Sequence, residues 1–236
     1  MTQTALRISV PFGLAVLVAC GGGGGPAEPT PAPAPVTRPS PTATARYSVT
    51  FDATWDGSTH PTDFPPNPHF SGLIGGTHRG TVSFWQDGGL ATEGIRLMAE
   101  RGRQTPLDIE VDAAIRAGHA QHLLVGSDVR SSPGSTSLEF AVSLDYPLVT
   151  LVTMVAPSPD WFVGVSGLSL LEGGDWVADR TVELTPWDAG TDSGVSYRSA
   201  DRVTAPPEPI HRLTGSPVSV GGSVPSMGRF VFRRLP

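Results

Sequence analysis

Three aspartates in two Gly- and Pro-rich segments have the residue types and spacing of a calcium site. Asp160 follows the turn Pro-Ser-Pro and precedes the aromatic Trp161. Asp188 and Asp192 lie in the loop Asp-Ala-Gly-Thr-Asp-Ser-Gly, whose small residues allow backbone carbonyls to approach a cation. Ca²⁺ prefers several hard oxygen ligands at flexible angles, and this spacing is not that of an EF-hand. Asp and Gly also build ordinary turns, so these residues by themselves leave a calcium loop and a plain turn both open.

Three histidines could support a different chemistry. His60, His69 and His78 are spaced nine residues apart in a Pro-rich stretch. Together they could hold zinc with an open fourth position, or assist acid–base chemistry around Asp160. Their spacing matches no regular secondary structure, so histidines bonded to loop backbone are the competing interpretation. If two of these histidines and a carboxylate met in one deep pocket, that arrangement would favour the hypothesis that the protein is an enzyme.

Familiar catalytic motifs are absent from the sequence. It contains no HExxH, no GxSxG, no P-loop and no GxGxxG. No nucleophile and base stand in a recognisable constellation. We therefore predict a protein that is not an enzyme, with a cell-surface metal-assisted hydrolase as the alternative.

The chain has one cysteine, and its position predicts a lipid anchor. Arg7 is followed by an apolar run that ends in Leu-Val-Ala-Cys20. The run is too short to span a bilayer as a helix and is typical of a signal peptide. The ending resembles a bacterial lipobox, which predicts residues 1–19 as a lipoprotein signal peptide and Cys20 as the acylated residue. An ordinary secretory signal with a chance cysteine is the alternative.

A low-complexity spacer follows the cysteine. Residues 21–45 begin with five glycines and continue with alternating Ala and Pro. Such a segment is flexible at its Gly-rich base and extended in its Pro-rich part, and it has no apolar face to bury. We predict that residues 20–45 hold a folded domain, residues 46–236, away from a membrane. Gly21 after the cysteine matches the outer-membrane sorting pattern of Gram-negative lipoproteins, so we predict a lipid-anchored protein of the bacterial cell envelope, at the outer membrane or cell surface.

The composition excludes several classes of protein. The 236 residues include 28 glycines and 24 prolines, which is incompatible with a helical bundle or coiled coil. The net charge is −6 and lysine is absent, so nucleic acid is not an expected partner. One cysteine also excludes a disulfide scaffold.

Short alternating runs predict a mainly β fold. Tyr47 to Ala53 places apolar residues on one face at period two, and Leu138 to Leu144 does the same. Residues 148–155 are apolar on both faces, as in a central strand. Residues 163–171 and 176–184, and the pair Phe230 and Phe232, indicate further strands. Many short strands with frequent turns predict an antiparallel sandwich or barrel.

One segment has helical spacing instead. Leu90, Ile95 and Met98 recur at roughly helical intervals before Gly102, a suitable C-cap. The sequence therefore predicts one short helix near Leu90–Arg101. A helix over residues 114–124 is conceivable but is disfavoured by an internal glycine.

Several of these segments, taken together, resemble the spondin N-terminal domain family (F-spondin domain). The most specific ones are Pro-Ser-Pro-Asp-Trp-Phe-Val-Gly at 157–164 and Asp-Ala-Gly-Thr-Asp-Ser-Gly at 188–194. Supporting ones are Trp55 with His60-Pro, the stretch at 63–71, Thr-His at 77–78, Trp85, and residues 94–102. The resemblance spans nearly all of residues 47–213.

The resemblance implies a fold and a metal. The expected fold is an antiparallel β-sandwich resembling C2 domains, with calcium at one end. The expected ligands are Asp160, Asp188, Asp192 and the backbone carbonyl of Ala189. The animal family members are matrix and adhesion proteins with further modules and disulfides. We recognise no such modules within these 236 residues, and a single cysteine leaves no disulfide within them.

These observations predict a surface-displayed, calcium-binding module for adhesion or recognition. It would be tethered to a membrane through Cys20 and bind an extracellular protein or glycan. A purely structural envelope lipoprotein without a ligand is not separated from this hypothesis by the residues themselves.

Overall fold

The computed structural model describes residues 42–236 of the chain. The chain divides into two units, residues 1–38 and 39–236. The predicted signal peptide, Cys20 and the linker as far as residue 41 lie outside the described residues. The predicted linker extends to residue 45, whereas the first strand already begins at Thr44.

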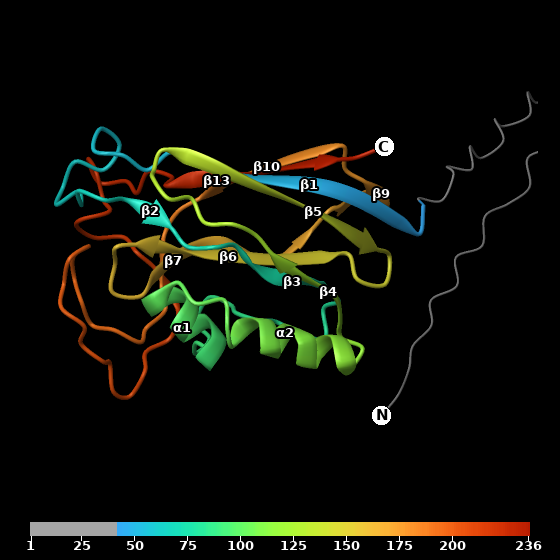
Figure 1. Ribbon diagram of the computed structural model, residues 1–236, viewed down its shortest axis with the longest axis horizontal. Coiled ribbons are helices and arrows are strands. Elements are labelled where there is room, and N and C mark those ends of the chain that lie inside the picture. Colours follow the sequence, from blue (N-terminus) through green and yellow to red (C-terminus); the bar gives the residue numbers. More distant parts are fainter. Residues whose placement is uncertain (1–41) are drawn as a thin grey trace, which may run out of the picture. The chain divides into compact units, whose positions relative to one another are not determined.

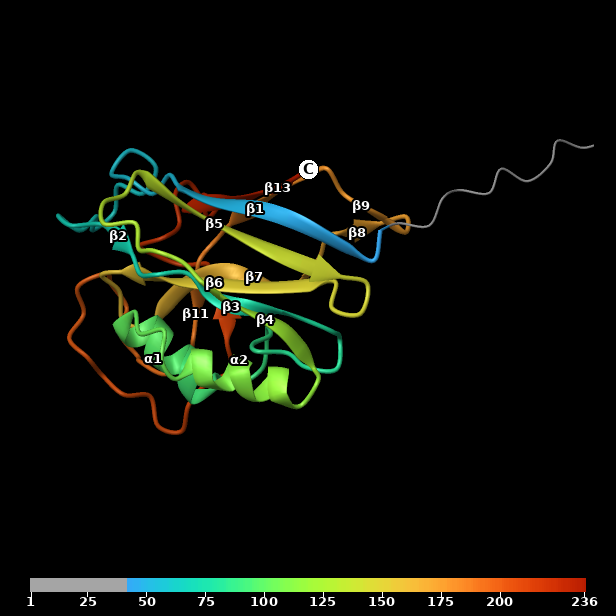
Figure 2. The ribbon, with the colours of Figure 1, turned by 45° about the vertical axis from the view of Figure 1, so that its right-hand side comes forward.

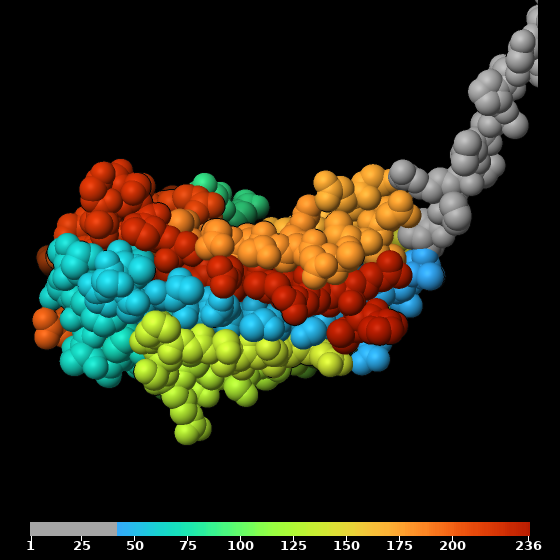
Figure 3. All heavy atoms as spheres, turned by 90° about the horizontal axis from the view of Figure 1, so that it is seen from above, coloured from blue at the N-terminus to red at the C-terminus, as the bar shows by residue number. Residues whose placement is uncertain are grey.

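The second unit contains two antiparallel sheets that face one another (Figure 1). The first sheet has four strands in the order β10-β13-β1-β5, which lie side by side in Figure 3. Its strands are β1 (Thr44–Ala53), β5 (Gly134–Ser143), β10 (Asp179–Leu184) and β13 (Gly228–Arg234). The two central strands are joined in register, with Phe51 opposite Phe230.

The second sheet has seven strands, in the order β12-β11-β7-β6-β3-β4, with β2 paired to β6. Its strands are β2 (His69–Phe70), β3 (Ile74–His78), β4 (Ala120–Val125), β6 (Leu148–Ala156), β7 (Trp161–Ser169), β11 (Trp187–Asp188) and β12 (His211–Arg212). A small hairpin of β8 (Leu171–Glu172) and β9 (Asp175–Trp176) completes the strands. The predicted antiparallel sandwich is therefore confirmed.

The alternating patterns place the predicted residues in the core. Tyr47, Val49 and Phe51 are buried on β1, as are Phe230 and Phe232 on β13. Strand β6 is buried along almost its whole length, because it lies between β3 and β7 and is covered on both faces. The segment predicted as one strand over 176–184 is divided between β9 and β10.

Two helices cover the face of the seven-stranded sheet that is turned away from the other sheet (Figures 1 and 2). Helix α1 (Glu93–Arg101) is capped by the side chain of Thr92 and ends at Gly102, whose φ is 63°. The predicted helix is therefore confirmed, but it begins three residues after Leu90. Leu90 itself is 63% exposed rather than part of the apolar face.

Helix α2 (Leu107–Arg116) is not part of the prediction from sequence. Its buried residues Leu107 and Val111 and the partly buried Ala114 and Ile115 recur at helical spacing. The helix conceived over residues 114–124 is wrong, because residues 120–125 form β4. Glu110 joins the two helices by accepting hydrogen bonds from the Thr92 hydroxyl and the Gly94 amide.

Two hydrophobic cores result from this layering. One fills the space between the sheets and includes Phe51, Trp55 and Trp161. The other lies between the seven-stranded sheet and the helices and includes Ile95 and Phe162. Both cores consist of residues from 45 onward, so this unit contains its own cores. Within residues 42–236, no helix has the length and apolar character needed to cross a bilayer.

Candidate metal centre

The pairing of β7 with β11 brings two of the three predicted aspartates together. Asp160 directly precedes β7, at the end of a turn in which the Ser158 hydroxyl accepts a hydrogen bond from the Trp161 amide. Asp188 is opposite Trp161 in the β7–β11 pair. The amide of Ala189 donates to the carbonyl of Asp160 at 3.2 Å. Residues far apart in sequence therefore become neighbours through the sheet.

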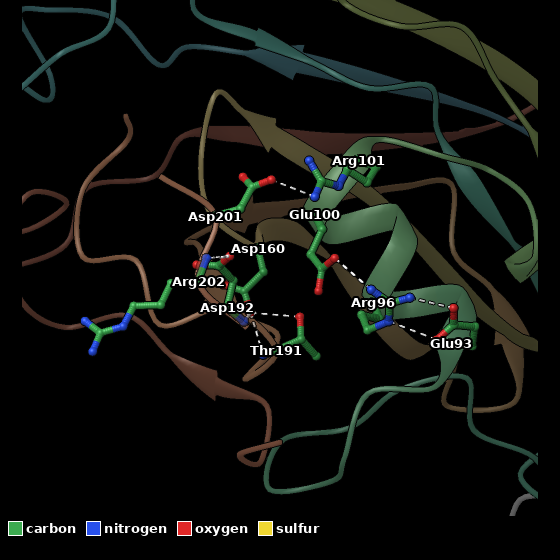
Figure 4. Close-up of polar contacts among 9 residues, drawn as sticks. All are labelled: Glu93, Arg96, Glu100, Arg101, Asp160, Thr191, Asp192, Asp201 and Arg202. Atoms are coloured by element: carbon green, nitrogen blue, oxygen red, sulfur yellow. Dashed lines mark hydrogen bonds and ion pairs between the residues drawn. The ribbon is translucent and has the colours of Figure 1, made fainter. Parts of the chain in front are cut away.

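The carboxylate of Asp160 is completely buried, and its two oxygens have different environments. Oδ2 accepts hydrogen bonds from the Thr191 amide (2.7 Å), the Asp192 amide (3.0 Å) and the Thr191 hydroxyl (3.1 Å), as Figure 4 shows in part. Oδ1 is buried and has no hydrogen-bond partner. An unsatisfied buried carboxylate oxygen is costly, and it is the group that a bound cation would satisfy.

Asp188 adds a second negative charge to this environment. Burial, and after it the charge of Asp188, raises the pKa of Asp160 from 3.8 to about 7, against the hydrogen bonds from Thr191 and Asp192. Burial also raises the pKa of Asp188, opposed by the Gly190 amide and the positive charge of His211. Two carboxylates that destabilise each other's charge favour a cation between them.

The loop that follows Asp188 requires glycine at one position. The amide of Gly190 donates a hydrogen bond to Asp188 Oδ1 at 2.7 Å, and the φ angle of Gly190 is +74°. A Cβ on Gly190 would lie 2.0 Å from the carbonyl oxygen of Glu208. Only glycine allows the loop to approach this closely and in this conformation.

Asp192 has a different set of contacts from the other two aspartates. Its Oδ1 accepts from the Gly194 amide (2.8 Å) and its Oδ2 from the Arg202 amide (2.6 Å), while the guanidinium of Arg202 points away (Figure 4). The side chain thus closes the loop between Asp192 and Val203, which form an isolated bridge. An ion pair between Arg101 and Asp201 holds this loop to α1.

These positions can be compared with the metal ligands that the sequence predicts. Within residues 42–236, no three His, Cys, Asp or Glu side chains are grouped so that they could hold a metal ion. Asp160 and Asp188 come together. The carbonyl of Ala189, the residue after Asp188, accepts no backbone hydrogen bond among the described residues. The side chain of Asp192 is directed to its own loop. The residues therefore fit a cation through two carboxylates and backbone oxygen, with Asp192 shaping the loop.

A shallow depression gives access to Asp188. It has a volume of about 230 Å³ and is lined by Trp161, Asp188, Gly194 and His211, among others. His211 is not among the site residues predicted from the sequence, because it comes from the distant β12 and no local motif marks it. Thr191 is not predicted either, although it lies within the predicted loop.

The three predicted histidines do not converge. His60 is fully buried, and its Nδ1 bonds to the Thr59 hydroxyl. His69 Nδ1 bonds to the Asn67 carbonyl in its own loop. His78 is the last residue of β3 in the seven-stranded sheet, where its Nε2 forms a hydrogen bond with the Thr150 hydroxyl. These residues therefore do not form the arrangement expected of an enzyme, in which two histidines and a carboxylate meet in one deep pocket.

The aromatic pair after Asp160 is buried, as its position at the start of a strand indicates. Trp161 is 2% exposed and packs edge-on against Tyr197. Phe162 is fully buried and packs against Trp85 on the helix side of the sheet. The two rings anchor opposite faces of β7, so the turn that carries Asp160 is fixed from both sides.

Comparison with known proteins supports the family resemblance that the sequence motifs indicate. The family model Spondin_N matches residues 45–221. Mouse Spondin-1 is 38% identical over 209 residues, covering 81% of this chain and 25% of Spondin-1. Human Spondin-2 is 36% identical over 176 residues, covering 73% of this chain and 53% of Spondin-2. The chain thus spans about a quarter of the length of Spondin-1 and about half that of Spondin-2. On these matches, the chain belongs to the spondin N-terminal domain family.

Proposed function

We propose that this protein is a non-enzymatic recognition module that binds calcium and is displayed on the bacterial cell surface by a lipid on Cys20. The single observation that carries the calcium proposal is the buried, unpartnered Oδ1 of Asp160 beside the charge of Asp188. Membership of the spondin family supports a recognition role outside the cell. The Leu-Val-Ala-Cys sequence supports the anchor.

The proposed calcium ligands are oxygens of this chain, completed by water. Asp160 and Asp188 supply carboxylate oxygens, Ala189 supplies its carbonyl, and Asp192 supports the loop and is the third candidate carboxylate. A bound calcium ion would supply positive charge that removes the repulsion between the two carboxylates. It would also connect the start of β7 to the loop that follows β11. Few charged ligands imply weak binding, about 10⁻⁴–10⁻³ M, suited to an exterior rich in calcium.

The calcium proposal is tested by thermal unfolding of residues 39–236 in EDTA, calcium or magnesium. Saturation at one hundred times Kd stabilises the native state by about 2.7 kcal/mol. We expect a rise in melting temperature of roughly 5–10 °C with calcium and less with magnesium, which keeps its waters. Sensitised terbium emission, excited through Trp161, reports binding directly.

Matched substitutions separate binding from general charge effects. Asp188→Asn keeps the size and the acceptor for Gly190 but removes the charge, so the calcium response should be largely lost. Asp145→Asn is the control, because Asp145 is exposed and belongs to no described contact. A wild-type midpoint indifferent to calcium, or an Asp188→Asn midpoint that still responds fully, would leave the loop as a plain turn.

The anchor is tested separately from the domain. Cells grown with an alkyne fatty acid should label the wild-type protein and not Cys20→Ala, which should also leave the membrane fraction. Persistent labelling of the variant would contradict acylation at Cys20. The extracellular protein or glycan partner is then sought by affinity capture with residues 39–236, with and without calcium.

A further inference from the structure

A groove beside strand β7 adjoins the depression that gives access to Asp188, and Arg212 lines both. It has a volume of about 400 Å³ and lies between β7, β10 and the loop that carries Trp85. Its lining includes Trp85, Gly164, Leu168, Val182 and Trp187. The groove is therefore bounded by both sheets and by a loop from the helix side.

The backbone of β7 has a free edge along this groove. Within the described residues, strand β11 pairs with β7 only at Trp161 and Phe162, and the chain before β11 leads away to β10 in the other sheet. The carbonyl of Asp160 accepts from the Ala189 amide on this side of β7, so by alternation the backbone groups of Gly164 also point to this side. Among the described residues, no strand occupies this side of β7 beyond Phe162. Unpaired strand edges are templates for strand addition.

The groove has one cation with no acidic partner. The guanidinium of Arg212 stacks 4.1 Å from the ring centroid of Trp187, and its Nη1 bonds to the Thr185 hydroxyl. Arg212 forms no ion pair within the described part of the chain. The stacked ring and the hydroxyl hold the guanidinium in place, which leaves it available to a carboxylate.

We propose that this groove binds an extended peptide segment that adds as a strand to the free edge of β7. The regular part of the free edge is short, because a bulge interrupts the pairing with β6 between Val165 and Leu168, where Gly167 has a φ of +60°. The added segment would therefore pair with the backbone of Gly164 and make its other contacts through side chains. Aliphatic side chains of the segment would contact Leu168, Val182 and Leu184. An acidic side chain would pair with Arg212, whereas Asp87 and Glu183 on the rim disfavour a peptide acidic throughout.

Peptide is favoured over glycan because the free edge offers the backbone donor and acceptor of Gly164 beside apolar side chains of the groove. The test uses a phage-displayed library of random nonapeptides, selected on residues 39–236. The expected sequences alternate aliphatic residues and carry one acidic residue. With an enriched peptide, ¹⁵N NMR should show shifts at the Gly164 amide and at the indole of Trp187.

Charge reversal provides the decisive comparison. Arg212→Glu should weaken an acidic peptide roughly tenfold or more and select a basic residue at the same place. Arg130→Glu is the control, because Arg130 is exposed and does not line the groove, and it should behave as wild type. Absence of enrichment, shifts confined to other surfaces, an acidic preference unchanged in Arg212→Glu, or binding of oligosaccharides alone would overturn the proposal.

Discussion

Two aspartates in this protein sit in turns and accept similar hydrogen bonds, yet their acidities move in opposite directions. Asp56, after β1, accepts from the Ser58 amide and hydroxyl and from the Thr59 amide, and these bonds lower its pKa. Asp160 accepts from two amides and a hydroxyl, but its pKa is raised to about 7. Hydrogen bonds alone therefore do not decide the charge of a loop aspartate.

Burial and a neighbouring charge account for the difference. Asp56 lies in a solvent-accessible turn, so the hydrogen bonds to its charged form dominate. Asp160 is completely buried and faces Asp188, so both desolvation and repulsion oppose its charge. The first arrangement stabilises a turn by itself, whereas the second gains stability from a proton or a cation.

The largest expected effect comes from opening the buried region to solvent. Trp161→Ala removes a ring that is 2% exposed and packs against Tyr197. We expect a loss of about 3–5 kcal/mol in the free energy of unfolding, measured by urea denaturation. Leu90→Ala, at a residue 63% exposed, is the control and should change little. A Trp161→Ala protein as stable as this control would contradict the anchoring role.

The second effect is a pH dependence caused by Asp160 in metal-free protein. Because its folded pKa, about 7, lies above the ordinary 3.8, the folded state holds its proton more tightly than the unfolded state. Stability should therefore fall as pH rises from about 4 to 7, by roughly 2–4 kcal/mol from this group. Calcium should oppose the fall.

Asp160→Asn tests the assignment of this pH dependence. The amide is of similar size, keeps an acceptor for Thr191 and Asp192, and cannot ionise. Its unfolding free energy in EDTA should be flatter between pH 4 and 7 than that of the wild type. An unchanged slope would assign the dependence to other groups.

The smallest effect concerns the accessible turn and has the opposite sign. The lowered pKa of Asp56 means that its stabilisation is present at neutral pH and is lost as pH falls below about 4. Asp56→Ala should cost about 1 kcal/mol at pH 7 and less at pH 3, measured by thermal unfolding. Asp145→Asn again serves as the exposed control. If the loss of stability in Asp56→Ala became larger as the pH was lowered, Asp56 would not have the opposite pH dependence to Asp160.

The parts of the fold predicted from sequence are those with strong local patterns. Alternation on β1 and β13 and continuous apolarity on β6 identify strands, because side-chain direction follows from backbone geometry alone. Gly102 marks the end of α1 for a similar local reason. Helix α2 also has apolar residues at helical spacing in the sequence. Its first turn, however, follows a proline and carries Asp108 and Glu110, a composition that is typical of a loop.

The amino-acid sequence by itself determined the candidate aspartates, the β-rich domain, the family resemblance and the likeness of residues 17–20 to a lipobox. Only the tertiary structure decided that Asp160 meets Asp188, that Asp192 is directed to its own loop, and that the three histidines lie apart. It also decided that β7 has a free edge beside Arg212. The physical reason is that pairing between distant strands, and the burial it produces, sets which charges face one another, and no local pattern encodes that.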